Sequence, residues 1–386
     1  MAIATILAAM PAVAAPRIPA NDAEVVERLP YKLADPANRE LRRLRAALAG
    51  DPRNMVAAVR LSRRYFEIAA AEGDPRYIGY AEAVLRPWTQ QPDVPAAISM
   101  ERSLLRQYRH QFDAALADLD RVLAGDPEHI EAMYWRVAIF LVQAEYDKVR
   151  QGCSQIEPLA PPLSVIACTA TVDGLTGRAR TAYETLSAAL AKYPTDNPDQ
   201  AQWMQTRLAE MALRKGDRPV AEKHFRAAIT AGDTDGFVLA AYADFLLDEN
   251  RPAEVVSLLR DWVRSDILLL RLALAESLLK LPAAAEHAAA LRERFAAAAL
   301  RGDRLHLQEE ARFELALRGD AARAVQLAAE NYQVQREPRD ARVLLEAAVA
   351  ARRPAAAKPA LDWLRRTGYG EPRYRELGET LQRMPQ

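Results

Sequence analysis

Residues 112–129 read FDAALADLDRVLAGDPEH, in which apolar side chains recur at positions i, i+3, i+4 and i+7. This spacing is typical of one face of an α-helix. Asp126-Pro127 ends the helix, because the residue before a proline is disfavoured in helical geometry, whereas proline itself suits the start of the next helix. The preceding residues 96–111 also carry apolar residues at helical spacing. We therefore expect two amphipathic helices joined by a turn.

This pattern is an internal repeat. The same order of small, apolar and turn residues returns near residues 182–194 and 221–233, and another unit starts at Ile130. A unit of two short helices cannot bury its own apolar face, so it must stack on copies of itself. The sequence thus predicts an all-α protein, an α-solenoid of stacked antiparallel helix pairs.

These spacings resemble the tetratricopeptide repeat, a 34-residue helix-turn-helix unit with alternating small and large residues before a proline. The matching residues are Ala115, Leu119, Val122 and Pro127 in one unit, Ala182, Leu186, Ala189 and Pro194 in the next, and Ala221, Phe225 and Ala228 in a third. In the third unit Asp233 replaces the proline. Gly177, Gly216 and Gly319 fall at the turn between paired helices, where glycine provides a left-handed cap. The resemblance implies a right-handed superhelix, and the full chain is similar to uncharacterised exported bacterial tetratricopeptide proteins.

The repeat pattern divides the chain into five segments. These are a signal peptide (1–14), a linker (15–36), divergent N-terminal helical repeats (37–95), tetratricopeptide repeats (96–265), and divergent C-terminal helical repeats with a capping helix (266–386). In the unit at residues 55–88, seven extra residues, AAAEGDP, separate the paired helices. The apolar run 267–281 contains charged residues and therefore fits a buried solenoid helix better than a membrane span. Residues 373–384 are the expected capping helix, and about nine helical pairs precede it.

The first residues, MAIATILAAMPAVAA, form an apolar segment that ends in a small-x-small pattern at Ala12-Val13-Ala14. This pattern predicts a secretory signal cut after Ala14, and hence a periplasmic or secreted protein. The segment is shorter than the about 20 apolar residues of a bilayer span. No Lys or Arg precedes the apolar run, which leaves open either an upstream start codon or an ordinary alanine-rich N-terminus.

Charge and motifs bound the chemistry. The 52 basic and 52 acidic residues balance, which argues against nucleic acid as a partner. Nucleophile-elbow, phosphate-loop, zincin and dinucleotide motifs are all missing from the sequence, so we expect no catalysis, cofactor or metal. His306 and Glu310 lie one helical turn apart but have no third metal ligand nearby in the sequence. The acidic segment 233–236 lacks the later ligands of a calcium loop, and we interpret it as a turn between repeats.

Cys153 and Cys168 are the two cysteines of the chain, and three prolines lie between them. If the flanking helices form a hairpin about this proline loop, the two cysteines lie at similar heights. A disulfide is then plausible, provided that their Cα atoms lie within about 7 Å and the compartment is oxidising. The alternative is two buried free thiols that serve as small core residues.

The resemblance also implies a binding surface, because the first helices of tetratricopeptide pairs line the concave side. The corresponding residues are Met100, Leu104, Tyr108, Tyr134, Leu141, Val142, Ile166, Leu175, Trp203 and Phe237. Such an apolar and aromatic groove suits an extended peptide or an amphipathic helix. The alternative for each residue is packing between neighbouring repeats. The Lys and Asn residues with which some tetratricopeptide domains grip a terminal carboxylate are mostly absent from these positions.

Two classes of function follow. The first is a non-catalytic scaffold that binds a protein partner in the bacterial cell envelope. The second is a scaffold for carbohydrate or polysaccharide handling or secretion, which would use exposed aromatics such as Trp88, Trp203 and Trp262. Trp262 falls at a core position of the repeat. An enzyme with an unfamiliar site is a third and weaker interpretation.

Overall fold

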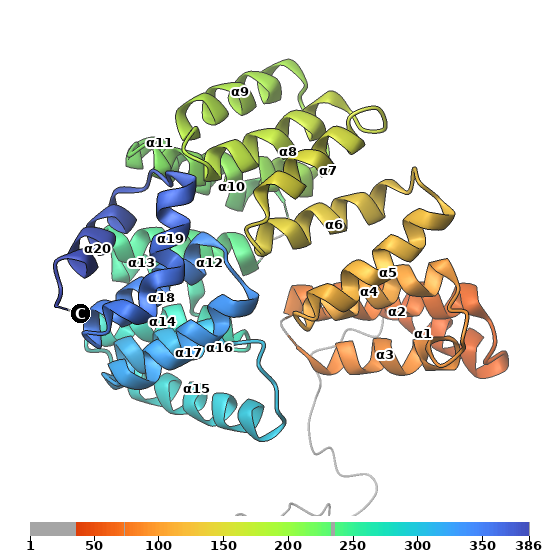
Figure 1. The fold of residues 1–386 in the computed structure, drawn as a ribbon. Helices are drawn as coiled ribbons and strands as arrows, with labels where there is room; N and C mark the ends of the chain where they lie inside the picture. The colour runs from red at the N-terminus through yellow and green to blue at the C-terminus, as the bar shows by residue number, and fades with distance from the viewer. Residues whose placement is uncertain (1–35, 73, 233–235, 386) are drawn as a thin grey trace, which may run out of the picture. The chain divides into compact units, whose positions relative to one another are not determined.

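The computed structural model describes residues 36–72, 74–232 and 236–385. Within these ranges the regular secondary structure is helical: twenty α-helices, a π-helical turn η1 (Glu314–Arg318) and a 3-10 turn η2 (Pro354–Ala357) (Figure 1). The chain divides into two compact units at Pro52. The described part of the first unit is α1 (Pro36–Gly50). The predicted signal peptide 1–14 lies outside the described residues.

The second unit contains α2–α20, and its helices pack in consecutive pairs. The pairs are α2 (Met55–Glu72) with α3 (Arg76–Thr89), α4 (Ala96–Tyr108) with α5 (Phe112–Gly125), α6 (Ile130–Val142) with α7 (Tyr146–Ile156), α8 (Pro162–Leu175) with α9 (Ala179–Lys192), α10 (Pro198–Arg214) with α11 (Arg218–Ala231), α12 (Gly236–Asp248) with α13 (Pro252–Leu259), α14 (Asp266–Leu278) with α15 (Ala283–Leu300), α16 (Leu307–Phe313) with α17 (Ala321–Val334), and α18 (Pro338–Ala350) with α19 (Lys358–Thr367). Helix α20 (Pro372–Gln382) follows as the expected capping helix.

The turn inside each pair from α4–α5 onward contains one residue with left-handed backbone geometry. These residues are His110, Ala144, Gly177, Gly216, Asn250, Lys280, Gly319 and Arg352, with φ between 53° and 81°. They recur about every 34 residues, the period of the repeat. Each reverses the chain between a first and a second helix, so the register extends through the divergent C-terminal repeats as well.

The first complete pair differs from its expected form. The sequence pattern places a seven-residue insertion between the two helices, but α2 continues as a helix through Glu72. Alanine is the best helix former, so Ala69, Ala70 and Ala71 lengthen the helix instead of forming a loop. The predicted turn at 233–236 falls between α11 and α12: residues 233–235 lie outside the described residues, and Gly236 begins α12.

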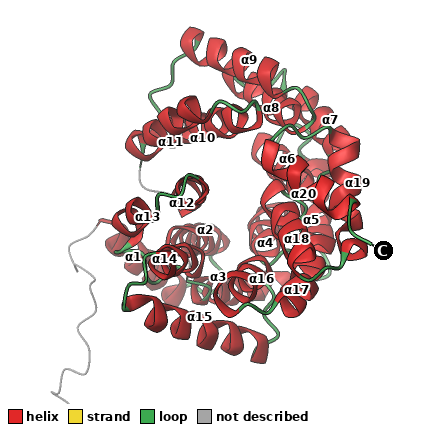
Figure 2. Cartoon of the chain, turned by 90° about the vertical axis from the view of Figure 1, so that its left-hand side faces the viewer, coloured by secondary structure: helices red, strands yellow, loops and turns green. Residues whose placement is uncertain are grey.

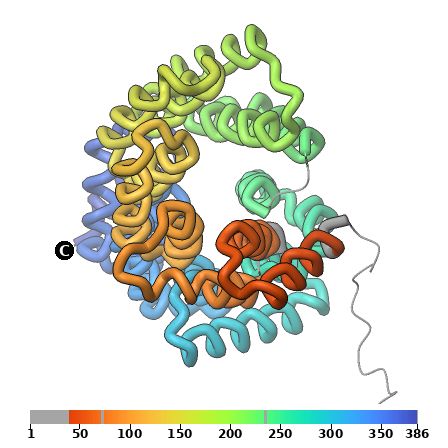
Figure 3. The backbone as a smooth tube through the Cα atoms, turned by 90° about the vertical axis from the view of Figure 1, so that its right-hand side faces the viewer, coloured from red at the N-terminus to blue at the C-terminus, as the bar shows by residue number. Residues whose placement is uncertain are grey.

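The C-terminal helices pack against helices from the middle of the sequence. Helices α16–α20 share one hydrophobic core with α6, α7 and α8. At its centre the indole Nε1 of Trp363 donates a hydrogen bond of 3.0 Å to the Tyr146 hydroxyl. The backbone N–H of Arg336 donates to the carbonyl of Val142, at 2.7 Å. Figures 2 and 3, which view the chain from two opposite sides, show the helices of the second unit arranged in a ring. The repeats of the second unit therefore close on themselves.

Helix α14 contains the apolar run expected to be a buried solenoid helix, and nine of its thirteen residues are buried. Together with α10–α13, α15 and α16 it forms a second hydrophobic core. No helix within the described ranges has both the length and the apolar character needed to cross a bilayer.

Candidate binding groove

An apolar cavity of about 330 Å³ lies across the first helices of three successive repeats, α6, α8 and α10. Its lining consists of Tyr134, Val137, Ala138, Leu141, Ser164, Ala167, Cys168, Thr171, Gln200, Trp203 and Met204. Not one of these eleven described side chains carries a formal charge. Trp203 is 39% exposed, which is unusual for a large aromatic residue in this chain. The cavity therefore offers an uncharged surface with an accessible indole.

A second cavity, of about 290 Å³, adjoins the first and is strongly charged. Ala138, Leu141, Thr171 and Trp203 line both cavities. The charged lining comprises six arginines and six carboxylates, namely Arg207, Arg214, Arg218, Arg312, Arg339, Arg342, Glu210, Asp244, Asp248, Glu337, Glu346 and Glu371. The returning helices α16, α18 and α20 provide part of this wall, so the closure of the repeats builds the second cavity.

Arginine side chains and aromatic rings alternate between the two cavities. The Arg207 guanidinium lies 5.5 Å from the ring centre of Trp203 and 5.2 Å from that of Phe237. Arg339, from α18, lies 5.2 Å from the same Phe237 ring. Cations at such distances are attracted by the ring quadrupole. This arginine–aromatic ladder connects α10, α12 and the returning α18.

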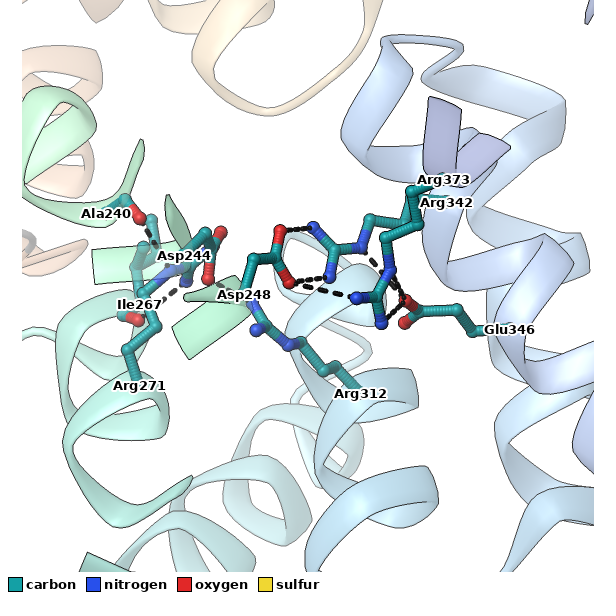
Figure 4. A network of polar contacts seen from close by, with 9 residues as sticks. All are labelled: Ala240, Asp244, Asp248, Ile267, Arg271, Arg312, Arg342, Glu346 and Arg373. Carbon is teal, nitrogen blue, oxygen red and sulfur yellow. Dashed lines mark hydrogen bonds and ion pairs between the residues drawn. The ribbon is translucent and has the colours of Figure 1, made fainter. Parts of the chain in front are cut away.

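The two carboxylates of α12 organise the charged wall (Figure 4). Asp244 and Asp248 are four residues apart and therefore share one face of the helix. Arg271 of α14 donates to Asp244 at 2.7 Å, and Arg312 of α16 donates to it at 2.5 Å. Arg342 of α18 donates twice to Asp248, at 2.6 and 2.7 Å. Helix α12 is thus the hub that joins three other first helices.

The network continues to the last helix, and its arginines hold Asp244 ionised. Arg373 of α20 donates to Asp248 at 3.2 Å and to Glu346 at 2.8 Å. Burial acts against ionisation of Asp244, but Arg271 and its other arginine neighbour outweigh it and hold the Asp244 pKa well below its usual range. Burial lowers the pKa of the Arg271 guanidinium, although Asp244 opposes this effect.

Six of the ten residues predicted to face the groove line the two cavities: Tyr134, Leu141, Val142, Leu175, Trp203 and Phe237. Leu175 is buried and belongs to the core shared with the C-terminal helices, so it contributes to packing. Tyr108 and Ile166 line neither cavity, and both are half-buried.

Met100 and Leu104 are corrections to the expected groove. They are 4% and 1% exposed and belong to the core formed mainly by α4, α5 and α6. Helix α4 is in contact with α2, α5 and α6, so it is covered on several sides and leaves no such residues for a partner. Trp88 is also buried, and Trp262 packs against the second core, so neither provides an exposed ring.

Cys153 of α7 and Cys168 of α8 are joined by a disulfide, with their Cα atoms 5.8 Å apart. Cys168 lines the apolar cavity, so the bond lies directly behind the groove. His306 stands at the N-cap position of α16 without a side-chain capping hydrogen bond, and it lies 3.8 Å from Glu309. Glu310 instead pairs with an arginine of α17. Within the described residues, no three His, Cys, Asp or Glu side chains gather as metal ligands would.

The sequence alone does not predict the arginine–aromatic ladder or the α12 hub. The spacing of Asp244 and Asp248 was a local signal, because two carboxylates one turn apart on an otherwise apolar helix require partners. Their arginine partners come from distant repeats and carry no local mark of that role.

No protein-family model matches the chain, and no curated protein sequence matches it. Solved structures do match. The structure of the APC/C hetero-tetramer Cut9–Hcn1 is similar, with a TM-score of 0.50 and 11% identity over 89% of this chain and 66% of that chain. A tetratricopeptide repeat protein from Parabacteroides merdae ATCC 43184 matches with a TM-score of 0.43 and 16% identity, over 62% of this chain and 85% of that one. The P58(IPK) TPR domain matches with a TM-score of 0.24 and 14% identity, over 90% and 97%. The paired helices and the similarity to Cut9–Hcn1 establish that this chain has the tetratricopeptide-repeat fold.

Proposed function

We propose that the chain is a non-catalytic scaffold that holds an extended peptide segment of a protein partner in the groove. The observation that carries this proposal is the pair of adjoining cavities, one uncharged and one charged, across the first helices of successive repeats. An extended chain can place alternate side chains in such pockets.

The size of the cavities favours an extended segment over a helix. Each cavity, at 330 or 290 Å³, is near the lower end of the roughly 300–1,000 Å³ of ligand sites. A helix with its side chains is about 10–12 Å wide. Helices α16, α18 and α20 line the charged cavity, whose volume of about 290 Å³ leaves little room for a structure of that width.

The charged groups support a structural role over a catalytic one. Asp244, Asp248 and Glu346 all accept hydrogen bonds from guanidinium groups. Asp244 is a poor general base, because Arg271 and Arg312 hold its pKa well below its usual range.

We further propose that the protein works in the bacterial cell envelope. The disulfide between Cys153 and Cys168 supports this setting, because disulfides persist in oxidising compartments. Expression of the full chain in a bacterium, followed by fractionation and N-terminal sequencing, tests it. We expect a periplasmic or secreted product that begins at Ala15; an uncleaved chain confined to the cytoplasm would contradict the proposal.

Capture from a periplasmic extract tests the scaffold. We expect one stoichiometric protein partner, whose capture falls at least tenfold in Trp203→Ala. The matched control is Leu300→Ala, because Leu300 is 91% exposed on α15 and lines neither cavity. Equal capture by both variants would contradict the groove as the binding site. Binding only to cell-wall or exopolysaccharide fractions would instead support the carbohydrate alternative, for which the exposed Trp203 is the one favourable observation.

A further inference from the structure

The uncharged cavity has features that select its occupant. It excludes charged groups, because no lining side chain carries an opposite charge and burial of an unpaired charge is costly. An engineered cavity of about 150 Å³ holds benzene, so 330 Å³ is sufficient for an aromatic ring together with its linker to a backbone.

Hydrogen-bonding groups in the wall of the uncharged cavity favour a ring that carries a hydroxyl. Within the described part of the chain, the hydroxyl of the half-buried Tyr134 bonds to no other protein group, and it is still accessible to solvent. Gln200 accepts a hydrogen bond from Thr195 at 2.5 Å, and its amide contacts Ser164 at a long 3.4 Å. The amide N–H groups of Gln200 therefore retain hydrogen-bonding capacity. A ligand ring with its own hydroxyl can meet these groups, whereas a wholly apolar ring leaves them unpaired.

The opening of the cavity suits a ring that arrives on a peptide. Trp203 lies where the two cavities meet, and its indole lines both. Beyond it, paired arginines and carboxylates present donors and acceptors of both signs, such as Arg207 with Glu210 at 3.0 Å. A backbone that enters through this rim finds partners for its amide groups, and interface anchors are commonly aromatic.

We propose that the cavity between α6, α8 and α10 is an anchor site for a tyrosine side chain of the partner peptide. This inference rests on the proposed function for the peptide itself, but the site can be tested without any partner. The phenol ring stacks near Trp203, and its hydroxyl exchanges a hydrogen bond with the Tyr134 hydroxyl.

The probe is 4-fluorophenol, which mimics the tyrosine side chain, and binding is measured by fluorine NMR of the full chain. We expect millimolar or tighter binding that is at least tenfold stronger than that of 4-fluorobenzoate, a charged ring of similar size. Equal binding of the two compounds, or undetectable binding of 4-fluorophenol, would overturn the proposal.

Variants locate the binding. Ala138→Leu fills the cavity from α6, and we expect it to reduce 4-fluorophenol binding at least tenfold. Ala227→Leu is the matched control, because Ala227 is a half-buried alanine of α11 that lines neither cavity. We expect no change there, and the melting temperatures of both variants are measured to confirm folding. Loss of binding in both, or in neither, would place the probe elsewhere.

The hydroxyl contact has its own test. Tyr134→Phe should weaken 4-fluorophenol by about fivefold, the effect of one hydrogen bond, and leave fluorobenzene unchanged. Equal weakening of both would mean that Tyr134 acts only as a wall. If a partner protein binds through Trp203 but 4-fluorophenol does not bind, the proposed tyrosine site is contradicted and the proposed scaffold function is supported. If 4-fluorophenol binds but no partner is captured, the proposed scaffold function is contradicted and the proposed site for a phenol ring is supported.

Discussion

Single glycines decide how closely neighbouring helices approach. Gly152 is buried in the middle of α7, where an added Cβ would overlap the Cγ2 of Val137 on α6. Gly79 of α3 has open space at the same position. Both residues are helical, so intrinsic helix propensity favours alanine at both by about 1 kcal/mol. Helix propensity predicts the same effect for alanine at both positions, so any difference in stability between the two variants comes from packing.

We expect Gly152→Ala to lower the free energy of unfolding by about 1–2 kcal/mol, because overpacking outweighs the gain in propensity. Gly79→Ala should raise the same free energy by roughly 0.5–1 kcal/mol. Urea denaturation of both variants provides the measurement. A stabilised Gly152→Ala protein would mean that α6 and α7 do not approach as closely as described.

At the scale of the element, the disulfide fixes the hairpin of α7 and α8. Cys153 and Cys168 are 15 residues apart. Replacing both by alanine should lower the free energy of unfolding by roughly 3 kcal/mol, since a cross-link of this loop length restricts the unfolded chain. Urea denaturation with and without reductant gives the comparison. Reductant should destabilise only the parent protein; an equal response of the variant would contradict this account.

The start of α18 contains a group that titrates near neutral pH. Asp340 is buried, accepts hydrogen bonds from Asn331 at 2.8 Å and from the backbone N–H of Glu337 at 2.9 Å, and completes a capping box. Burial raises the Asp340 pKa to about 7, and the nearby Glu337 carboxylate adds to this effect. Between about pH 4 and pH 7, the folded state therefore keeps a proton on Asp340, whereas the unfolded state has lost it.

Stability from Asp340 is therefore complete below its unfolded pKa and is lost as the pH rises through about 7. From pH 5 to pH 8 we expect a loss of up to about 3 kcal/mol in the free energy of unfolding that Asp340→Asn lacks. Urea denaturation of both proteins at the two pH values measures the difference. Parallel pH dependence in the two proteins would show that Asp340 does not titrate in this range.

The elements themselves were largely predictable from the sequence, because their signals are local. Apolar spacing and a proline defined α4 and α5, and Gly177 marked the turn between α8 and α9. The segment that begins at Ala69 is an exception: its glycine and proline indicate a loop, but its first residues, Ala69 to Glu72, are good helix formers and continue α2. For the groove, the helical register identified Tyr134 and Trp203, but it could not show that α4 is covered on several sides.

At the scale of the whole second unit, the main feature is that its repeats close on themselves. In an ordinary solenoid each repeat contacts only its neighbours. Here Trp363 bonds to Tyr146, and Arg342 bonds to Asp248. Such contacts join residues that are far apart in sequence, and no local pattern signals them, so sequence reasoning predicted an open concave surface instead.

The turn between α8 and α9 contacts the end of α19, so a substitution in this turn can test the closure. Gly177 has φ +81°, and an added Cβ would lie 3.2 Å from the carbonyl oxygen of Thr367 at the end of α19. Gly216 has φ +80° with open space around it. Left-handed geometry destabilises both alanine variants by about 1–2 kcal/mol, and only Gly177→Ala also crowds α19. We expect Gly177→Ala to be the more destabilised by about 1 kcal/mol or more in urea denaturation. Equal losses would argue against contact with α19.

The closure is tested most directly by a distance between the two segments that it joins. Spin labels are attached to cysteines introduced as Arg180→Cys and Arg366→Cys, both exposed positions near this contact. The native cysteines are paired and so do not react with the label. The account predicts one short distance by double electron–electron resonance. An open solenoid would place α9 and α19, the helices that carry the two labels and lie five repeats apart, at about 40–50 Å. A distribution centred there would contradict the closure.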